Sequence, residues 1–173
     1  MQPPTPPRGA FTLPEFGVLV LILAMLAGVL VPRVSDRLAV SRDTLRISEL
    51  RELREAVERF RAEQGRYPRA NAPAGGDGYV RSTDGDFLGE LVRAGYLQEP
   101  ARDPLNRGAY YLGYGLFEAG TEGCKGSTPF YVLGVHRFEN ERFAENHPGY
   151  FRCARKDWNA DFEHVTGGGA SIH

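Results

Sequence analysis

The sequence of 173 residues has little of several features on which protein functions commonly depend. Its 21 basic and 22 acidic residues leave a formal net charge of −1, which argues against a nucleic-acid binder that works through a broad basic surface. It holds two cysteines and four histidines, and it contains neither a Gly-x-Ser-x-Gly elbow nor a phosphate-binding glycine loop. We therefore expect a protein that is not an enzyme and that does not bind nucleic acid directly.

Long hydrophobic runs are also scarce, since the sequence has only one, from Phe11 to Val31. This excludes a polytopic membrane protein. As a helix, the run would be about 31 Å long, which matches the hydrocarbon core of a bilayer. Its uninterrupted apolar part, from Phe16 to Val31, is also close in length to the apolar region of a secretory signal peptide.

Three interpretations of this run compete. A cleaved signal peptide is disfavoured because Pro32 and Arg33 directly follow the run, where a small-x-small cleavage site is needed. An ordinary membrane anchor leaves Glu15 unexplained, because a carboxylate in an apolar segment costs about 2.5–3.5 kcal/mol at the helix centre and less near an end. The third interpretation gives Glu15 a partner.

The segment Gly9–Glu15 reads Gly-Ala-Phe-Thr-Leu-Pro-Glu and leads directly into the apolar run. It resembles the prepilin-peptidase site of type IV pilins and of the pseudopilins of type II secretion systems. The resemblance implies cleavage between Ala10 and Phe11, N-methylation of Phe11, and pairing of Glu15 with the N-terminal amine of a neighbouring subunit. Pro32 matches the kinking proline that pilins commonly carry near the membrane exit.

Two positions depart from the family pattern, and one charge argument opposes the implied orientation. Ala10 stands where glycine is usual, with Gly9 one step earlier, and Pro14 stands where an aliphatic residue is common. Cleavage after Gly9 would move Glu15 from its usual place, which favours cleavage after Ala10. Five arginines follow the run against one before it, so the positive-inside rule alone would place the C-terminal part in the cytoplasm. Long domains translocate with little regard to charge, and we expect a cytoplasmic N-terminus with the head outside.

The helical pattern continues beyond Pro32. Apolar residues recur at steps of three, four or their multiples, which predicts one stripe on a helix that packs under a small domain: Val34, Leu38, Leu45, Leu50, Leu53, Val57 and Phe60. Gly65, followed by Pro68, predicts the end of this helix. Two separate helices, or a coiled coil, are the alternatives, although the heptad register is irregular for a coiled coil.

The rest of the chain predicts an α+β head. Gly65-x-Tyr67-Pro68 and Pro100-x-x-Asp103-Pro104 resemble passages of the type II pseudopilins. A short helix is expected over 86–94 with Asp86 as its N-cap, and strands are expected over 109–117, 129–138 and 150–158. The resulting prediction is a pilin fold, in which a long N-terminal helix packs on a small antiparallel sheet. Its parts are a leader (1–10), a transmembrane and assembly segment (11–31), an amphipathic half-helix (32–65), a head (66–166) and a flexible tail (167–173).

Two features of the head concern a disulfide bond and the ligands of a metal ion. An even cysteine count in an exported domain predicts one disulfide, Cys124–Cys153, with two free cysteines as the alternative. Asp157, Asn159 and Asp161 place oxygen-bearing side chains at alternate positions, like the opening of a calcium loop, although Phe162 replaces the glycine such a loop needs. Calcium is the one ion this pattern suggests, and a solvated acidic turn is the alternative.

The resemblance implies a structural subunit of the inner membrane that polymerises with other pilin-like subunits into a helical filament. Its partners would be the prepilin peptidase, an assembly ATPase and an inner-membrane platform protein. The two motifs of the head, Gly65-x-Tyr67-Pro68 and Pro100-x-x-Asp103-Pro104, favour a pseudopilus of a type II secretion-like system. The alternatives are a type IV pilus subunit for adhesion, motility or DNA uptake, and a membrane-anchored binding module that does not polymerise.

Overall fold

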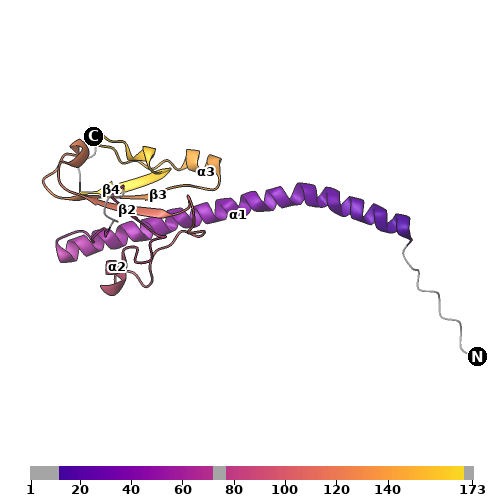
Figure 1. Ribbon diagram of the computed structural model, residues 1–173, viewed down its shortest axis with the longest axis horizontal. Helices are drawn as coiled ribbons and strands as arrows, with labels where there is room; N and C mark the ends of the chain where they lie inside the picture. The colour runs from indigo at the N-terminus through magenta and orange to yellow at the C-terminus, as the bar shows by residue number, and fades with distance from the viewer. Residues whose placement is uncertain (1–11, 72–76, 170–173) are drawn as a thin grey trace, which may run out of the picture. The chain divides into compact units, whose positions relative to one another are not determined.

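A computed structural model describes residues 12–71 and 77–169 of the chain (Figure 1). The chain divides into two compact units, Met1–Leu38 and Ala39–His173. The predicted cleavage residues Ala10 and Phe11 lie outside the described residues. In chain order the elements are α1 (Leu13–Gln64), β1 (Tyr79–Arg81), α2 (Gly89–Arg93), β2 (Leu112–Phe117), η1 (Thr121–Gly123), β3 (Phe130–Val135), α3 (Glu141–Asn146), η2 (Trp158–Ala160) and β4 (His164–Gly168).

The predicted single long helix is confirmed. α1 runs without interruption through Pro32, although proline lacks the N–H that would bond to the carbonyl of Gly28. The helix ends at Gln64, and Gly65 follows in the left-handed conformation (φ 70°), which glycine adopts without strain. The α+β layout is confirmed as well, since a four-stranded antiparallel sheet in the order β1-β2-β3-β4 follows α1.

One face of the sheet packs on the part of α1 that belongs to the Ala39–His173 unit. Tyr114, Tyr131 and Leu133 are fully buried on this face and belong to one core with helix residues Leu53 and Val57. The predicted stripe is therefore right for its second half. It is wrong at Leu45, which is 54% exposed, because the helix turns Asp43, Arg46 and Ile47 toward the head instead.

The opposite face of the sheet carries a second core. Strand pairing places Gly113 beside Gly134, and the ring of Phe162 lies directly over both, so that a Cβ at either position would come within 2.6 Å of the ring. Phe151 and Trp158 pack alongside. β3 is buried at all six positions because α1 covers one face and the chain around residues 149–162 covers the other.

Several predicted elements need correction. The segment 150–158 is not a strand, since it has only an isolated bridge between Arg152 and Asp157 and then enters η2. Asp86 does not cap α2, whose N-cap position is Leu88 in a left-handed conformation without a side-chain cap. The predicted tail from residue 167 begins inside β4, which pairs with β3. The strands β1 and β4 and the helix α3 were not predicted.

Candidate functional site

The N-terminal turn of α1 holds Glu15, the predicted assembly residue. One carboxylate oxygen of Glu15 accepts hydrogen bonds from the backbone N–H of Thr12 (2.8 Å) and from its hydroxyl (2.7 Å). Thr12 precedes the first helical residue, so the bond from its N–H to the Glu15 carboxylate is one half of a capping box. Within one chain, Glu15 therefore stabilises the start of its own helix through neutral donors only.

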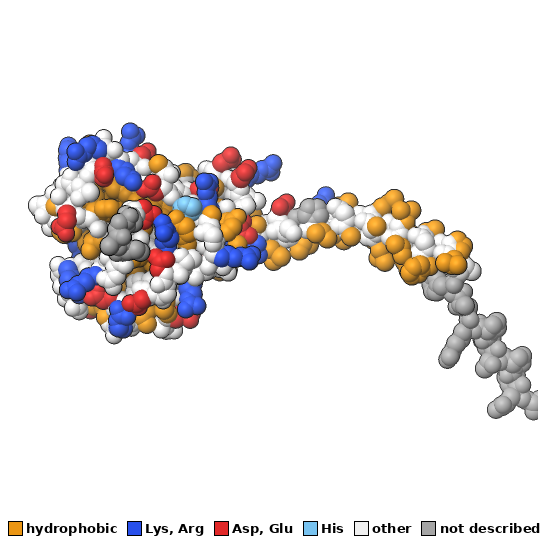
Figure 2. Space-filling view, viewed as in Figure 1, with side chains coloured by type: hydrophobic (Ala, Val, Ile, Leu, Met, Phe, Trp, Pro, Cys, Tyr) orange, Lys and Arg blue, Asp and Glu red, His pale blue; other side chains and the backbone are white. Residues whose placement is uncertain are grey.

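The residues that follow Glu15 expose their apolar side chains in every direction. Leu19, Leu23 and Leu30 are 45–55% exposed, and none of the residues from 12 to 31 is buried. Orange side chains surround this part of α1 in the space-filling view, whereas red and blue side chains gather on the Ala39–His173 unit (Figure 2). Among the described residues, α1 is the one helix whose length and composition would allow it to cross a bilayer.

A buried charge cluster connects the first helical turns of the Ala39–His173 unit to its loops. Arg46 has no exposed side-chain surface, and its guanidinium bonds to Asp103 through Nε (2.6 Å) and Nη2 (3.0 Å). Nη1 of Arg46 bonds to Asp43 (2.5 Å) and to Glu139 (2.9 Å), and Arg42 closes the cluster with a second pair of bonds to Glu139. The ion pairs therefore join α1 to segments 57 and 93 residues further along the chain.

The electrostatics of this cluster follow from its partners. Burial alone would lower the pKa of Arg46, but the bonds and charges of Asp103, Glu139 and Asp43 outweigh burial and raise it. The hydrogen bond from Arg42, with that from Arg46, lowers the pKa of the Glu139 carboxyl below its ordinary value. Asp43 also accepts the backbone N–H groups of Glu139 and Asn140 (3.0 and 2.9 Å), so each charged group of the cluster has a partner, although three carboxylates face two guanidinium groups.

The predicted disulfide is confirmed. Cys124 and Cys153 are bonded, with their Cα atoms 4.8 Å apart, and both are buried at the edge of the second core. The bond ties the loop after β2 to the segment that precedes Trp158, which is itself fully buried among Phe117, Phe130 and Phe151. The disulfide thus holds the segment that covers the outer face of the sheet.

The three predicted calcium ligands have other partners in the structure. Asp157 caps η2 by accepting the N–H of Asn159 (3.0 Å), and the amide of Asn159 donates to the carbonyl of Gly149 (2.9 Å). Asp161 accepts from the hydroxyl of Tyr79 (2.9 Å) and pairs with the ammonium of Lys156 (2.7 Å). In the ranges 12–71 and 77–169, no three side chains of His, Cys, Asp or Glu converge as a metal site would require. Calcium binding at this turn stays a prediction.

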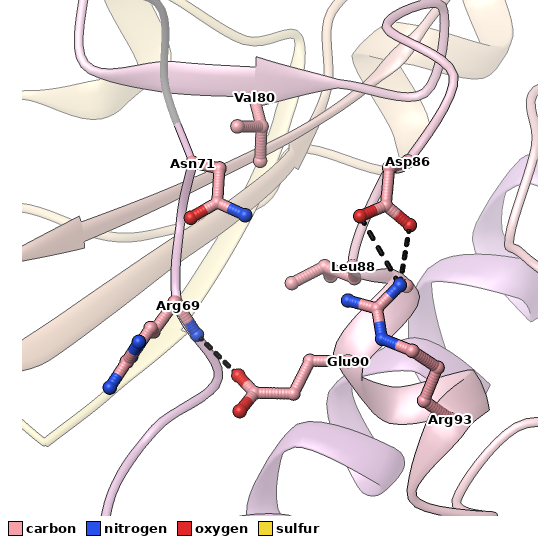
Figure 3. A pocket seen from close by; sticks show the side chains of 8 residues that line it. Arg69, Asn71, Val80, Asp86, Leu88, Glu90 and Arg93 are labelled. Atoms are coloured by element: carbon pink, nitrogen blue, oxygen red, sulfur yellow. Dashed lines mark hydrogen bonds and ion pairs between the residues drawn. The ribbon is translucent and has the colours of Figure 1, made fainter.

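Among the hollows lined by described residues of the head, three bear on function. The first, of about 220 Å³, lies between Val80 and α2, and in Figure 3 the paired Asp86 and Arg93 face it while Glu90 accepts the backbone N–H of Arg69. The second, of about 270 Å³, is lined by the network of Tyr79, Lys156 and Asp161, together with His136 stacked on Tyr111 (4.3 Å between centroids). The third, of about 360 Å³, lies at the end of α1.

Asp86 and Arg93 of the first hollow pair with each other, and so do Lys156 and Asp161 of the second. Burial, and then the hydrogen bond to Asp161, raise the pKa of the Tyr79 hydroxyl above its ordinary range, so this phenol stays protonated and donates to the carboxylate. Neither hollow holds a nucleophile paired with a base in the manner of acyl-transfer or glycosidic sites.

Comparisons with known protein families, with curated proteins and with solved structures find no match to this chain.

The disulfide was predicted correctly, the assembly role of Glu15 stays a prediction, and the buried cluster was not predicted. A signal for the cluster was present: Asp43 and Arg46 are three residues apart, on the face that continues through Ile47 and Leu50 into the core. The Thr12-x-x-Glu15 capping box was also legible in the sequence.

Proposed function

We propose that this chain is a pilin-like structural subunit that prepilin peptidase cleaves and that polymerises into a pseudopilus of a type II secretion-like system. The observation that carries the proposal is the position of Glu15. It is the one ionisable residue between Phe11 and Val31, it lies in the first turn of α1, and exposed apolar side chains follow it in every direction.

A carboxylate at this place needs a cationic partner once the run is surrounded by lipid or by other apolar helices. Thr12 supplies only neutral donors, and a second chain that begins at Phe11 would supply a positive amine. Pairing between the two would set the axial register of neighbours, while the apolar surfaces of the helices exchange lipid contacts for contacts with each other. The anchor and the polymerisation surface would then be the same residues.

Two further observations favour a head outside the cytoplasm. The disulfide Cys124–Cys153 is typical of an oxidising compartment. Two of the arginines that follow the apolar run, Arg42 and Arg46, are committed to carboxylates of the head, so they contribute less to a positive-inside signal than a count of charges suggests.

The experiment separates the pairing of Glu15 between chains from its capping within one chain. Glu15→Gln keeps the capping geometry, because glutamine serves in a capping box, but it removes the charge. Thr12→Val removes the hydroxyl donor and keeps the charge. Expression in a host with a prepilin peptidase and a pseudopilus assembly system, followed by shearing and intact-mass measurement, reports both cleavage and incorporation.

We expect all three proteins to be cleaved before Phe11 and to carry a methyl group on the new N-terminus. We expect wild type and Thr12→Val in sheared filaments and Glu15→Gln in the membrane only. A mature chain that starts at Met1 or near Pro32 would exclude the proposal. Normal incorporation of Glu15→Gln would exclude the pairing mechanism.

The membrane-anchored binding module is the second candidate, and the third hollow favours it, because a pocket needs no polymer. It predicts that cleaved or uncleaved chains remain in the membrane as single copies. Crosslinking through cysteines introduced at Leu19 and Leu23 distinguishes the two, since ladders of crosslinked chains form only in a filament.

A further inference from the structure

The hollow at the end of α1 combines an apolar floor with a rim of positive charge. Its volume is about 360 Å³, which falls within the range of small-ligand sites. Tyr67, Leu116 and Pro129 supply the apolar surface. The charged lining residues are all arginines, namely Arg61, Arg66 and Arg69.

The carboxylates of this chain neutralise only one of these arginines. Arg66 pairs with Glu90 (2.5 Å), and this bond lowers the pKa of Glu90. Arg61 lies over the ring of Tyr67 (4.7 Å to the centroid) and has no ion pair among the described residues. The guanidinium of Arg69 is likewise unpaired within ranges 12–71 and 77–169, and in Figure 3 it is directed away from Asp86 and Arg93.

The remaining residues of the chain offer no acidic side chain to fill this gap. Positions 1–11, 72–76 and 170–173 contain neither Asp nor Glu in the sequence. Among the described residues, the guanidinium groups of Arg61 and Arg69 therefore have no ion-pair partner. The last carbonyls of α1 carry a partial negative charge nearby, which opposes an anion, but two full positive charges outweigh it.

Tyr67 adds an independent sign of a missing ligand. Its side chain lines the hollow and is 95% buried, at 5% relative exposure, and its hydroxyl has no hydrogen-bond partner among the described residues. Burial also raises the pKa of this phenol, so it remains protonated and able to donate. Leaving a buried hydroxyl without a hydrogen-bond partner is costly, so an acceptor that reached this group would stabilise the protein.

We propose that this hollow, which we call the Arg61–Arg69 pocket, binds an organic carboxylate with a compact apolar body. The carboxylate would lie between the guanidinium groups of Arg61 and Arg69, whose planar forks match its geometry. The apolar body would pack on Tyr67, Leu116 and Pro129. The carboxyl-terminal residue of a partner polypeptide and a free aromatic acid share this chemistry. The proposal is independent of polymerisation.

Calorimetric titration of the full-length chain in a non-ionic detergent tests the proposal with four probes. N-acetyl-phenylalanine represents a polypeptide end, and 3-phenylpropionate represents a free acid. N-acetyl-phenylalaninamide lacks the charge, and acetate lacks the apolar body. We expect at least one of the two aromatic acids to bind at least tenfold more tightly than both the amide and acetate, and more weakly in 300 mM than in 20 mM salt. The tighter of the two acids identifies the source of the ligand.

Variants assign the binding to the pocket. Arg61→Gln combined with Arg69→Gln is expected to weaken binding of the preferred acid at least tenfold. The matched control, Arg93→Gln, removes an exposed arginine of the same head outside the pocket and is expected to change binding less than twofold. Urea unfolding of each variant verifies that the head remains folded.

Three results would overturn the proposal: equal binding of the acid and its amide, equal loss in the double variant and the control, or no binding of either acid at 10 mM. A chain shortened to end at Gly169 tests whether the last residues of the chain itself occupy the pocket. If only the shortened chain binds the acid, the pocket belongs to residues 170–173 of the chain itself and not to an external ligand.

Discussion

The two halves of α1 treat hydrophobic and charged side chains in opposite ways. In the Met1–Leu38 unit, leucines such as Leu23 remain half exposed, and Glu15 takes part only in a cap at the helix end. In the Ala39–His173 unit, the fully buried Arg46 directly follows the exposed Leu45. Burial along one helix therefore depends on which other elements pack against each turn. Apolar residues that no other element covers identify a surface suited to an apolar environment.

The largest expected effect comes from removing the buried charge. Arg46→Leu leaves the buried carboxylates of Asp43 and Asp103 without a cation, so we expect a loss of about 3–5 kcal/mol in the unfolding free energy of the head. Urea unfolding followed by the fluorescence of Trp158, the one tryptophan, measures it. Arg33→Leu, in the other unit, is the control and should leave the midpoint unchanged. Equal midpoints for wild type and Arg46→Leu would contradict the comparison.

A similar loss is expected from opening the disulfide. Replacing both cysteines with serine frees a loop of 29 residues, and the chain-entropy relation gives a loss of about 3–4 kcal/mol. The same urea titration, run with and without reductant on the wild-type protein, should reproduce the effect of the double variant. If reductant leaves the unfolding midpoint in place, the disulfide does not stabilise the second core.

The pH dependence of the cluster is a smaller effect with a defined sign. Since hydrogen bonds from Arg42 and Arg46 lower the pKa of Glu139 in the folded head, its contribution is present above the unfolded pKa of about 4.3 and is lost as pH falls through the lower folded value. Glu139→Gln should cost about 1.5–3 kcal/mol at pH 7 and flatten the fall in stability below pH 4.5. Parallel stability curves for the two proteins between pH 5 and 3 would be the contrary result.

The smallest effect sharpens the comparison at a single position. Leu45→Ala removes an exposed side chain and should change the unfolding free energy of the head by less than about 0.5 kcal/mol. Leu50→Ala, one and a half turns later on the buried face, should cost about 2–5 kcal/mol. Comparable losses in both variants would mean that Leu45 contacts the head after all.

The elements that the sequence predicted well are those with strong local patterns. α1 was predicted because apolar residues recur at helical spacing up to Gly65, where glycine takes the left-handed conformation. β2 and β3 were predicted because aromatic and aliphatic residues dominate them. β4 was missed because only Val165 and Thr166 favour a strand, whereas Gly167 and Gly168 do not; Phe151 lies so close to Gly167 that a Cβ there would clash.

The candidate site was predictable where one residue type carried its own chemistry. Glu15 stood out because an acid within an apolar run is costly, and the cysteines stood out by their number. The segment 150–158 was misjudged because its aromatic residues suggested a strand, whereas Phe151 and Trp158 fill the second core from an irregular loop. The rest of the buried cluster and the Arg61–Arg69 pocket depend on contacts between residues far apart in the chain, and only the spacing of Asp43 and Arg46 gave a local signal.

The long reach of Arg46 has a consequence for the order of events while the chain is synthesised. Its partners Asp103 and Glu139 follow it by 57 and 93 residues, so the guanidinium stays hydrated until more than half of the chain has emerged from the ribosome. The disulfide must wait longer still, since Cys153 emerges after Glu139. If the apolar run is held in the bilayer during this time, α1 is in place first, and the C-terminal loops of the head pack onto it last.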